Sequence, residues 1–186
     1  EVSVKEMVGA FSIYANKGVY NAPMMVTKIE DKYGNVLANF YPESREVITE
    51  NTAFLMANLL QGVVDEGTGR RLRFRYGFKN QIGGKTGTTQ NHSDGWFIGI
   101  TPDLAGGVWV GAEDRSIHFQ NLANGQGASM ALPIWALFMQ KVYADKSLAV
   151  PQSDFQKPNG VNHVLDCGDA DREGMTDYDS SDEIFD

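Results

Sequence analysis

The residues best suited to chemistry stand between positions 80 and 100, in the segment NQIGGKTGTTQNHSDGWFIGI. Lys85 lies between glycines and ahead of a run of threonines, so it could bind a phosphate or a carboxylate. A phosphate-binding loop requires a glycine, four further residues, and then Gly-Lys-Ser/Thr at the start of a helix. Counting back from Gly84 places Lys79 where the first glycine must stand, and the β-branched threonines favour a strand. This class of nucleotide site is therefore excluded.

As a strand, the Lys-Thr-Gly-Thr segment presents two different faces. Side chains alternate, so Lys85 and Gly87 face one side of the sheet while Thr86 and Thr88 face the other. A glycine in a strand permits close approach of another backbone. Such a strand suits an extended peptide that adds itself to the sheet edge. A buried strand whose lysine merely extends to solvent fits the same four residues, so the motif alone leaves both interpretations open.

Three helices are predicted from apolar periodicity and capping residues. Ser3 and Glu6 form a capping box at the first, and Thr49 is the N-cap of the second. In the third, Pro133 is expected near the first turn, where proline is tolerated. The helices are expected within residues 3–18, 49–69 and 127–145. The apolar face expected for the second consists of Phe54, Leu55, Leu59 and Val63.

The remaining segments are typical of β-structure. A hairpin is predicted within residues 24–41, with Gly34 in the turn at 32–35. Three further strands are predicted at residues 81–89, 94–102 and 105–114. Their short connections imply antiparallel neighbours. The order helix, hairpin, helix, three strands, helix predicts an α+β fold in which helices cover an antiparallel sheet.

Several ordered segments around the motif resemble one family. They are NLLQGVVDEGTGR, GGKTGTTQNHSDGWFIGITPDLAGGVWVG and GASMALPIWALFM. With the first helix and the hairpin, they resemble the penicillin-binding transpeptidases of the class A, bifunctional type over roughly residues 1–145. The resemblance implies a β-lactamase/transpeptidase-like fold, present here as an incomplete domain. Residues 1–150 are then the C-terminal portion of the domain, and residues 151–186 are an acidic tail that we expect to be disordered.

The resemblance also implies an activity and a set of site residues. The activity is D,D-transpeptidation in cell-wall crosslinking, with peptidoglycan stem peptides and β-lactams as ligands. Lys85 and Thr88 take catalytic roles, since Lys85 supplies positive potential and the Thr88 N–H is one oxyanion donor. Substrate binding falls to Thr86, Gly87, Thr88 and Thr89.

The two other signature motifs of the family, Ser-x-x-Lys and Ser-x-Asn, are absent from this sequence. No serine has a lysine three residues on or an asparagine two residues on, so this chain supplies no nucleophile. The family order places both motifs before Glu1. We therefore expect the chain alone to be inactive and to work with the N-terminal half of the same domain. The alternatives are a non-catalytic fragment or pseudoenzyme, and a β-lactamase or D,D-carboxypeptidase relative.

Other candidate residues have weaker patterns. Asp94 and Trp96 either shape the acceptor side of the cleft or serve as a turn cap and a core residue. His92, alone in its loop, is expected to be solvated. The alternating arginines 71, 73 and 75 are expected on one face of an extended, solvated edge.

Composition excludes several functional classes. The net charge is −8, and residues 166–186 alone hold nine acidic residues and one arginine, so the rest is neutral and unsuited to nucleic acid. A single cysteine and three scattered histidines indicate no metal site, and no cofactor is predicted. No stretch approaches the roughly 20 apolar residues that span a bilayer. The resemblance implies an extracytoplasmic location, on the periplasmic face of the bacterial membrane, with the anchor outside this chain.

Overall fold

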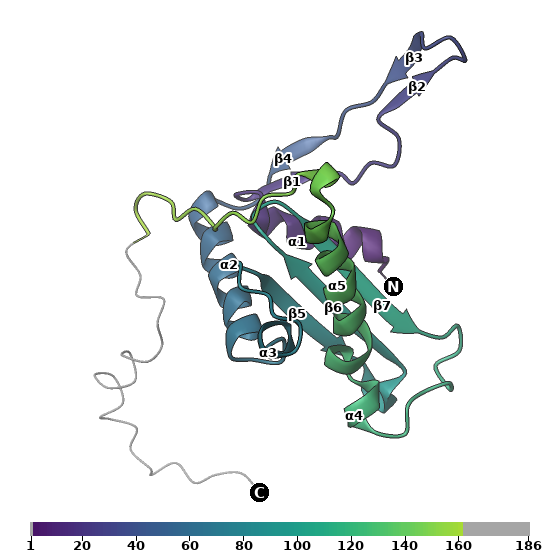
Figure 1. Ribbon diagram of the computed structural model, residues 1–186, viewed down its shortest axis with the longest axis vertical. Helices are drawn as coiled ribbons and strands as arrows, with labels where there is room; N and C mark the ends of the chain where they lie inside the picture. The colour runs from purple at the N-terminus through teal and green to yellow at the C-terminus, as the bar shows by residue number, and fades with distance from the viewer. Residues whose placement is uncertain (1, 162–186) are drawn as a thin grey trace, which may run out of the picture.

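A three-stranded antiparallel sheet of order β5-β6-β7 forms the centre of the structure, a computed structural model that describes residues 2–161 (Figure 1). The predicted α+β class, with helices covering an antiparallel sheet, is confirmed. The helices are α1 (Val4–Ala15), α2 (Glu50–Asp65), α3 (Arg71–Phe74), α4 (Leu122–Gly125) and α5 (Gly127–Ala144), with short 3-10 turns at Gln90–His92 and Lys146–Leu148. The strands are β1 (Val19–Asn21), β2 (Lys28–Glu30), β3 (Val36–Asn39), β4 (Ser44–Glu46), β5 (Gly83–Thr88), β6 (Asp94–Ile100) and β7 (Ala105–Gly111).

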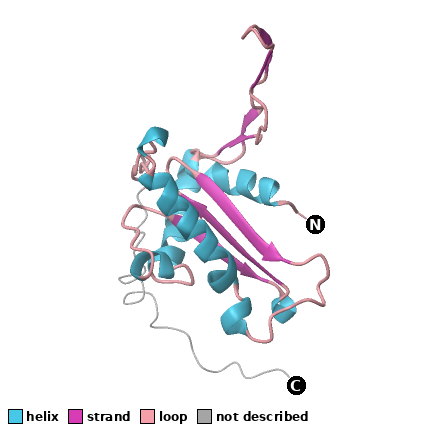
Figure 2. Ribbon diagram, turned by 45° about the vertical axis from the view of Figure 1, so that its right-hand side comes forward, coloured by secondary structure: helices cyan, strands magenta, loops and turns pink. Residues whose placement is uncertain are grey.

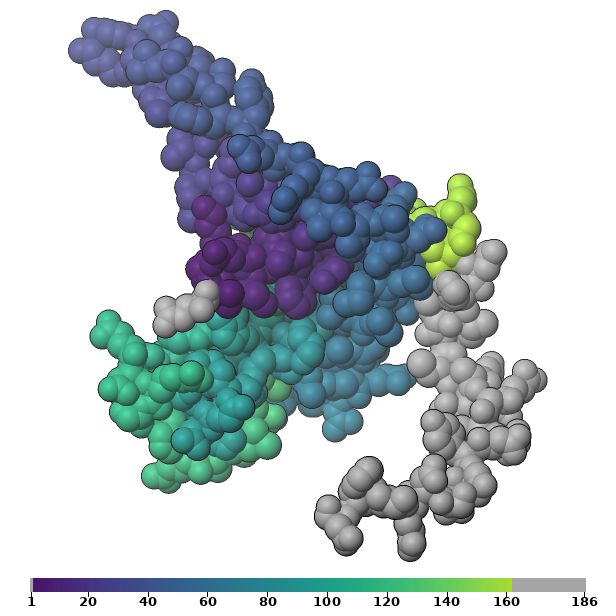
Figure 3. Space-filling view, turned by 180° about the vertical axis from the view of Figure 1, so that it is seen from behind, coloured from purple at the N-terminus to yellow at the C-terminus, as the bar shows by residue number. Residues whose placement is uncertain are grey.

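Helices cover both faces of this sheet. The consecutive glycines Gly106 and Gly107 of β7 show this directly, because a Cβ at the first would meet Trp135 of α5 and one at the second Val8 of α1. Neighbouring residues of a strand point to opposite faces. Helix α5 therefore lies on one face and α1 on the other, and the view from behind shows α1 across the sheet with α2 beside it (Figure 3).

The main core lies between the sheet and α5. Trp135 is only 2% exposed and packs edge-on against Phe97 of β6, with ring centroids 5.4 Å apart. A Cβ at Gly99 would lie 2.4 Å from the Trp135 ring, so the glycine of β6 makes room for the indole. Phe78, Leu72 and Val64, from the segments preceding β5, close the same cluster. The strand that carries the motif is thus fixed to a close-packed layer.

An arm of two strands projects from this body. Strands β2 and β3 pair as an antiparallel hairpin, and β1 and β4 pair where the arm joins α1 and α2 (Figures 1 and 2). The predicted turn is confirmed: Asp31 Oδ1 accepts the backbone N–H groups of Tyr33 and Asn35, and Gly34 has a φ of +87°. The hairpin extends away from the sheet that holds the motif.

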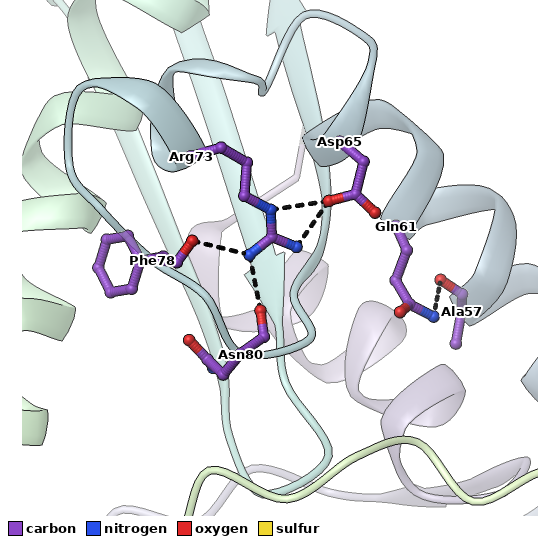
Figure 4. Close-up of polar contacts among 6 residues, drawn as sticks. All are labelled: Ala57, Gln61, Asp65, Arg73, Phe78 and Asn80. Carbon is purple, nitrogen blue, oxygen red and sulfur yellow. Dashed lines mark hydrogen bonds and ion pairs between the residues drawn. The ribbon is translucent and has the colours of Figure 1, made fainter.

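The segment between α2 and β5 is tied down by Arg73. Its Nε and Nη2 each lie 2.7 Å from Oδ1 of Asp65, and its Nη1 donates to the carbonyls of Phe78 and Asn80 (Figure 4). The side-chain amide of Asn80 in turn donates to the hydroxyl of Tyr143 on α5. Burial raises the pKa of Tyr143. One guanidinium therefore joins the end of α2 to the start of β5.

This geometry corrects the expectation for the alternating arginines. The expected extended edge is instead the short helix α3, and Arg71 and Arg73 are structural donors rather than solvated charges. Arg75 is exposed, and its guanidinium carbon lies 5.8 Å from the centroid of the Tyr76 ring.

Two details of the predicted helices are also wrong. Leu59 is 65% exposed, and the buried face of α2 consists of Ala53, Ala57, Leu60 and Val64. Helix α2 approaches β5 closely at this face, since a Cβ at Gly83 would lie 3.0 Å from that of Leu60. Pro133 is the seventh residue of α5 and not in its first turn, so it removes the helical bond to the carbonyl of Ser129.

The described chain continues beyond the domain limit expected at residue 150. Phe155 packs against the second apolar cluster, which includes Ala57, Leu60 and Ile100, and its N–H donates to Oε1 of Gln81. Val161 is 4% exposed. The domain limits at residues 150 and 151 stay a prediction. The acidic segment 166–186 lies outside the described residues.

We predict that Arg73→Lys lowers the free energy of unfolding by about 2 kcal/mol, because one ammonium cannot replace a fork that binds a carboxylate and two carbonyls. Urea unfolding followed by circular dichroism measures the change. Arg75→Lys, the same substitution on the exposed neighbour, is the matched control and should change it by less than about 0.5 kcal/mol. Equal effects of the two substitutions would show that the Arg73 contacts do not stabilise the fold.

Candidate functional site

The Lys-Thr-Gly-Thr motif lies on β5, an edge strand among the described residues. Strand β5 pairs with β6 in a continuous register from Gly83↔Ile100 to Thr88↔Gly95. Lys85 lies on the side of α1, beside a hollow of about 220 Å³ lined by Met7, Phe11 and Trp96 among others. Its Nζ donates to the carbonyl of Thr86 at 2.7 Å. The ammonium is therefore held at the motif itself.

Thr86 and Thr88 each have a partner from a distant part of the chain. The Thr86 hydroxyl lies 2.8 Å from that of Thr68, in the turn after α2. The Thr88 hydroxyl accepts the backbone N–H of Gly127, the first residue of α5, at 3.1 Å. A backbone N–H can only donate, so this contact leaves the Thr88 proton free for another acceptor. The Thr88 hydroxyl is therefore able to donate one hydrogen bond to a further acceptor.

Gly127 is positioned by very close packing. A Cβ at this position would lie 2.3 Å from the carbonyl oxygens of both Gly87 and Trp96, so only glycine fits. Arg71 holds the same turn from the other side, since its Nη1 donates to the carbonyl of Ala128 and the hydroxyl of Ser129. The start of α5 is thus clamped between α3 and the sheet.

A tight turn follows the motif. The Thr89 hydroxyl lies 3.0 Å from that of Ser93 and accepts the N–H of Asp94 at 3.2 Å. Asn91 and His92 both take left-handed conformations, with φ of 60° and 57°. His92 is half-buried rather than solvated as expected, and its carbonyl accepts the N–H of Phe119. This turn holds Thr89 at the end of the strand.

The structure places Asp94 and Trp96 on the face of Lys85, opposite the threonine hydroxyls. Trp96 pairs with Trp109 across the strands, and both line a hollow of about 510 Å³ with Asp94. Oδ1 of Asp94 is buried and has no hydrogen-bond partner within the described part of the chain. A role at the acceptor side of a cleft stays a prediction for these two residues.

Sequence reasoning missed three residues that hold the motif: Thr68, Arg71 and Gly127. Their partners lie 18, 57 and 39 positions away, separations that no local pattern encodes. The only signal was that Thr68 stands between two glycines in GTGR. Within residues 2–161, no group of three or more histidine, cysteine or acidic side chains is arranged to hold a metal ion. Nor is any helix there long and apolar enough to cross a membrane.

Comparison with known proteins identifies the class of this domain. The family model for the penicillin binding protein transpeptidase domain matches residues 1–128, so the chain belongs to this family. The resemblance expected from the sequence is confirmed. The Lys-Thr-Gly-Thr strand lies inside the matched region.

The relatives are penicillin-binding proteins of much greater length. The chain is 34% identical over 158 residues to penicillin-binding protein 1A of Aquifex aeolicus, covering 85% of this chain and 20% of that protein. It is 32% identical over 166 residues to penicillin-binding protein 2D of Bacillus subtilis, covering 86% of this chain and 22% of that protein. The chain thus spans about a fifth of the length of these curated relatives.

Solved structures share the fold. Penicillin-binding protein 1A from Haemophilus influenzae superposes with a TM-score of 0.74 at 24% identity, covering 85% of this chain and 28% of that one. PonA1 from Mycobacterium tuberculosis, solved in complex with penicillin V, gives 0.68 at 24% identity, covering 83% of this chain and 41% of that one. These likenesses confirm the fold expected from the family resemblance.

We predict that Gly127→Ala lowers the free energy of unfolding by about 1–3 kcal/mol, because its Cβ would overlap two carbonyl oxygens. Gly62→Ala, inside α2 with nothing within 4 Å of a new Cβ, is the matched control and should raise it by about 1 kcal/mol. Thermal unfolding of both variants measures the contrast. A neutral or stabilising Gly127→Ala would contradict the proposed clamp at the start of α5.

Proposed function

We propose that this chain supplies the substrate-binding wall of a peptidoglycan D,D-transpeptidase that crosslinks the bacterial cell wall. The observation that carries the proposal is the pair of threonine hydroxyls on β5, each held by a partner from outside the strand, with the Lys85 ammonium at the same segment. The two hydroxyls suit a carboxylate, because charge-assisted hydrogen bonds to anions are the strong ones, and the Lys85 ammonium on the other face of the strand adds positive potential.

In the proposed complex, a stem peptide runs antiparallel along β5 and ends in D-Ala-D-Ala. The hydroxyls of Thr86 and Thr88, with Lys85 nearby, bind the terminal carboxylate, or the equivalent carboxylate of a β-lactam. The N–H of Thr88 donates to the oxygen that becomes negative when the carbonyl is attacked. Gly87 and Thr89 complete the strand that the peptide lies against.

The reaction is a two-step acyl transfer through a serine supplied from outside these 186 residues. The serine oxygen attacks the carbonyl of the penultimate D-Ala, the peptide bond breaks, and the terminal D-Ala leaves with a proton. The amine of a second stem peptide then attacks the ester. A new peptide bond forms, and the proton that the amine loses returns to the serine. With a β-lactam, the serine opens the ring amide and the ester persists.

The partners and location follow from this proposal. The N-terminal half of the same domain is the partner that supplies Ser-x-x-Lys and Ser-x-Asn, and the assembled domain acts outside the cytoplasm through an anchor beyond this chain. One observation favours a second candidate, a non-catalytic fragment or pseudoenzyme: neither motif occurs among the serines of this sequence. A β-lactamase or D,D-carboxypeptidase relative would use the same wall.

We predict that this chain, incubated with a fluorescent penicillin, gives no covalent band on a denaturing gel, because no serine stands in the required motif. A longer protein that joins the chain to the two upstream motifs should give a band that unlabelled penicillin removes by competition. Stable labelling of the chain alone would contradict its assignment as the wall without the nucleophile. No labelling of the longer protein would favour the non-catalytic candidate.

We further predict that Thr88→Val in the longer protein slows penicillin labelling about tenfold or more, which corresponds to about 1.4 kcal/mol of transition-state stabilisation. The change keeps the shape of the side chain but removes the hydroxyl, which is the donor to the ligand and the acceptor of the Gly127 N–H. Thr27→Val, at an exposed position near the base of the hairpin arm, is the matched control and should label at the unmodified rate. Equal rates for the two variants would remove Thr88 from the site.

A further inference from the structure

We propose that Thr68, in the turn that follows α2, is a positioning residue that orients the Thr86 hydroxyl toward the substrate carboxylate. This inference rests on the proposed function and adds a residue outside the Lys-Thr-Gly-Thr strand to its carboxylate site. The hydroxyl oxygens of Thr68 and Thr86 are 2.8 Å apart, and either one could be the donor. The presence of an anion decides between these two arrangements.

A threonine hydroxyl has one proton to donate and two lone pairs that accept. When a carboxylate binds, the Thr86 hydroxyl donates its hydrogen bond to it, because a hydrogen bond to an anion is roughly twice as strong as a neutral one. Thr68 must then donate to Thr86. The Thr88 hydroxyl already accepts a hydrogen bond in this way, since the N–H of Gly127 donates to its oxygen. In this arrangement both threonines of the motif accept a hydrogen bond from a fixed donor and donate one to the ligand.

The turn that carries Thr68 is rigid for a packing reason. A Cβ at Gly67 would lie 2.9 Å from the Cα and carbonyl oxygen of Val63, and one at Gly69 would lie 3.1 Å from the same oxygen. The N–H of Gly69 donates to this carbonyl at 2.9 Å. Glycines are therefore needed on both sides, and Thr68 is the one residue of the triplet that carries a side chain.

Helix α3, which follows, locks the turn to the rest of the site. Leu72 is fully buried in the main core, and Arg71 donates to the carbonyl of Ala128 and the hydroxyl of Ser129 at the start of α5. The partner of Thr86 and the partner of Thr88 are therefore held by one segment. This continuity explains how an exposed threonine in a loop can keep a defined position.

The test uses the longer protein that joins this chain to its catalytic serine, with penicillin and penicillin methyl ester as probes. Thr68→Val should lower the second-order rate constant of acylation by penicillin about tenfold, mainly through weaker binding before acylation. The rate with the methyl ester, which lacks the carboxylate charge, should change less than twofold. Thr68→Ser, which keeps the hydroxyl, should restore most of the rate with penicillin.

The matched control is Thr52→Val. Thr52 also shares a hydroxyl contact, with Thr49 at 2.9 Å, but it lies about 20 Å away along the axis of α2. This variant should acylate at the unmodified rate. Thr68 is exposed, so the melting temperature of Thr68→Val should lie within about 2 °C of that of the unmodified protein. A loss of acylation rate in a variant of this stability is not caused by misfolding.

The outcomes separate this inference from the proposed function. If the unmodified longer protein is not acylated by penicillin, the proposed function fails, whatever Thr68 does. If it is acylated and Thr68→Val matches Thr52→Val, the role of Thr68 is overturned while the function stands. An equal loss with penicillin and with its methyl ester would also overturn the role, because the effect would not act through the carboxylate.

Discussion

The structure depends on the close approach of the first turn of α5 to the ladder between β5 and β6. At Gly127 there is no room for a side chain, because the carbonyls of Gly87 and Trp96 occupy the space. This contact brings a backbone N–H within hydrogen-bonding distance of Thr88, whereas any larger residue would move the helix away. The hydrogen bond that Thr88 accepts therefore depends on a steric constraint at the first residue of α5.

Near this contact, two arginines of the segment between α2 and β5 donate hydrogen bonds to neighbouring elements. Arg73 binds the carboxylate of Asp65 and two backbone carbonyls at once, and Arg71 binds one carbonyl and one hydroxyl at the start of α5. Such planar, many-donor contacts suit arginine and could not be made by lysine. Two of the three alternating arginines, Arg71 and Arg73, therefore make structural hydrogen bonds within the fold, whereas Arg75 is exposed.

The sequence predicted the three long helices, the hairpin and the three strands of the sheet, because each is set by periodicity, capping residues or glycine turns that act within a few positions. It misplaced the buried face of α2, which consists largely of alanines rather than Leu59, and it missed α3, α4 and the strands β1 and β4. Of the site, it identified Lys85 and the threonines of β5 but not Thr68 or Gly127. Those two act across tertiary distances, which depend on how closely α2 and α5 approach the strand.

The hydroxyl pair of Thr68 and Thr86 closes a loop of the chain, since the two residues are 18 positions apart and everything between them belongs to the α3 segment and the start of β5. A loop fastened at its ends and by Arg73 has its own free energy of local opening, distinct from that of the whole domain. A ligand that needs the closed form binds with an affinity reduced by the fraction of molecules that are closed. Changes far from β5, such as at Asp65 or Tyr143, would then act on ligand affinity through that fraction alone, without touching the ligand.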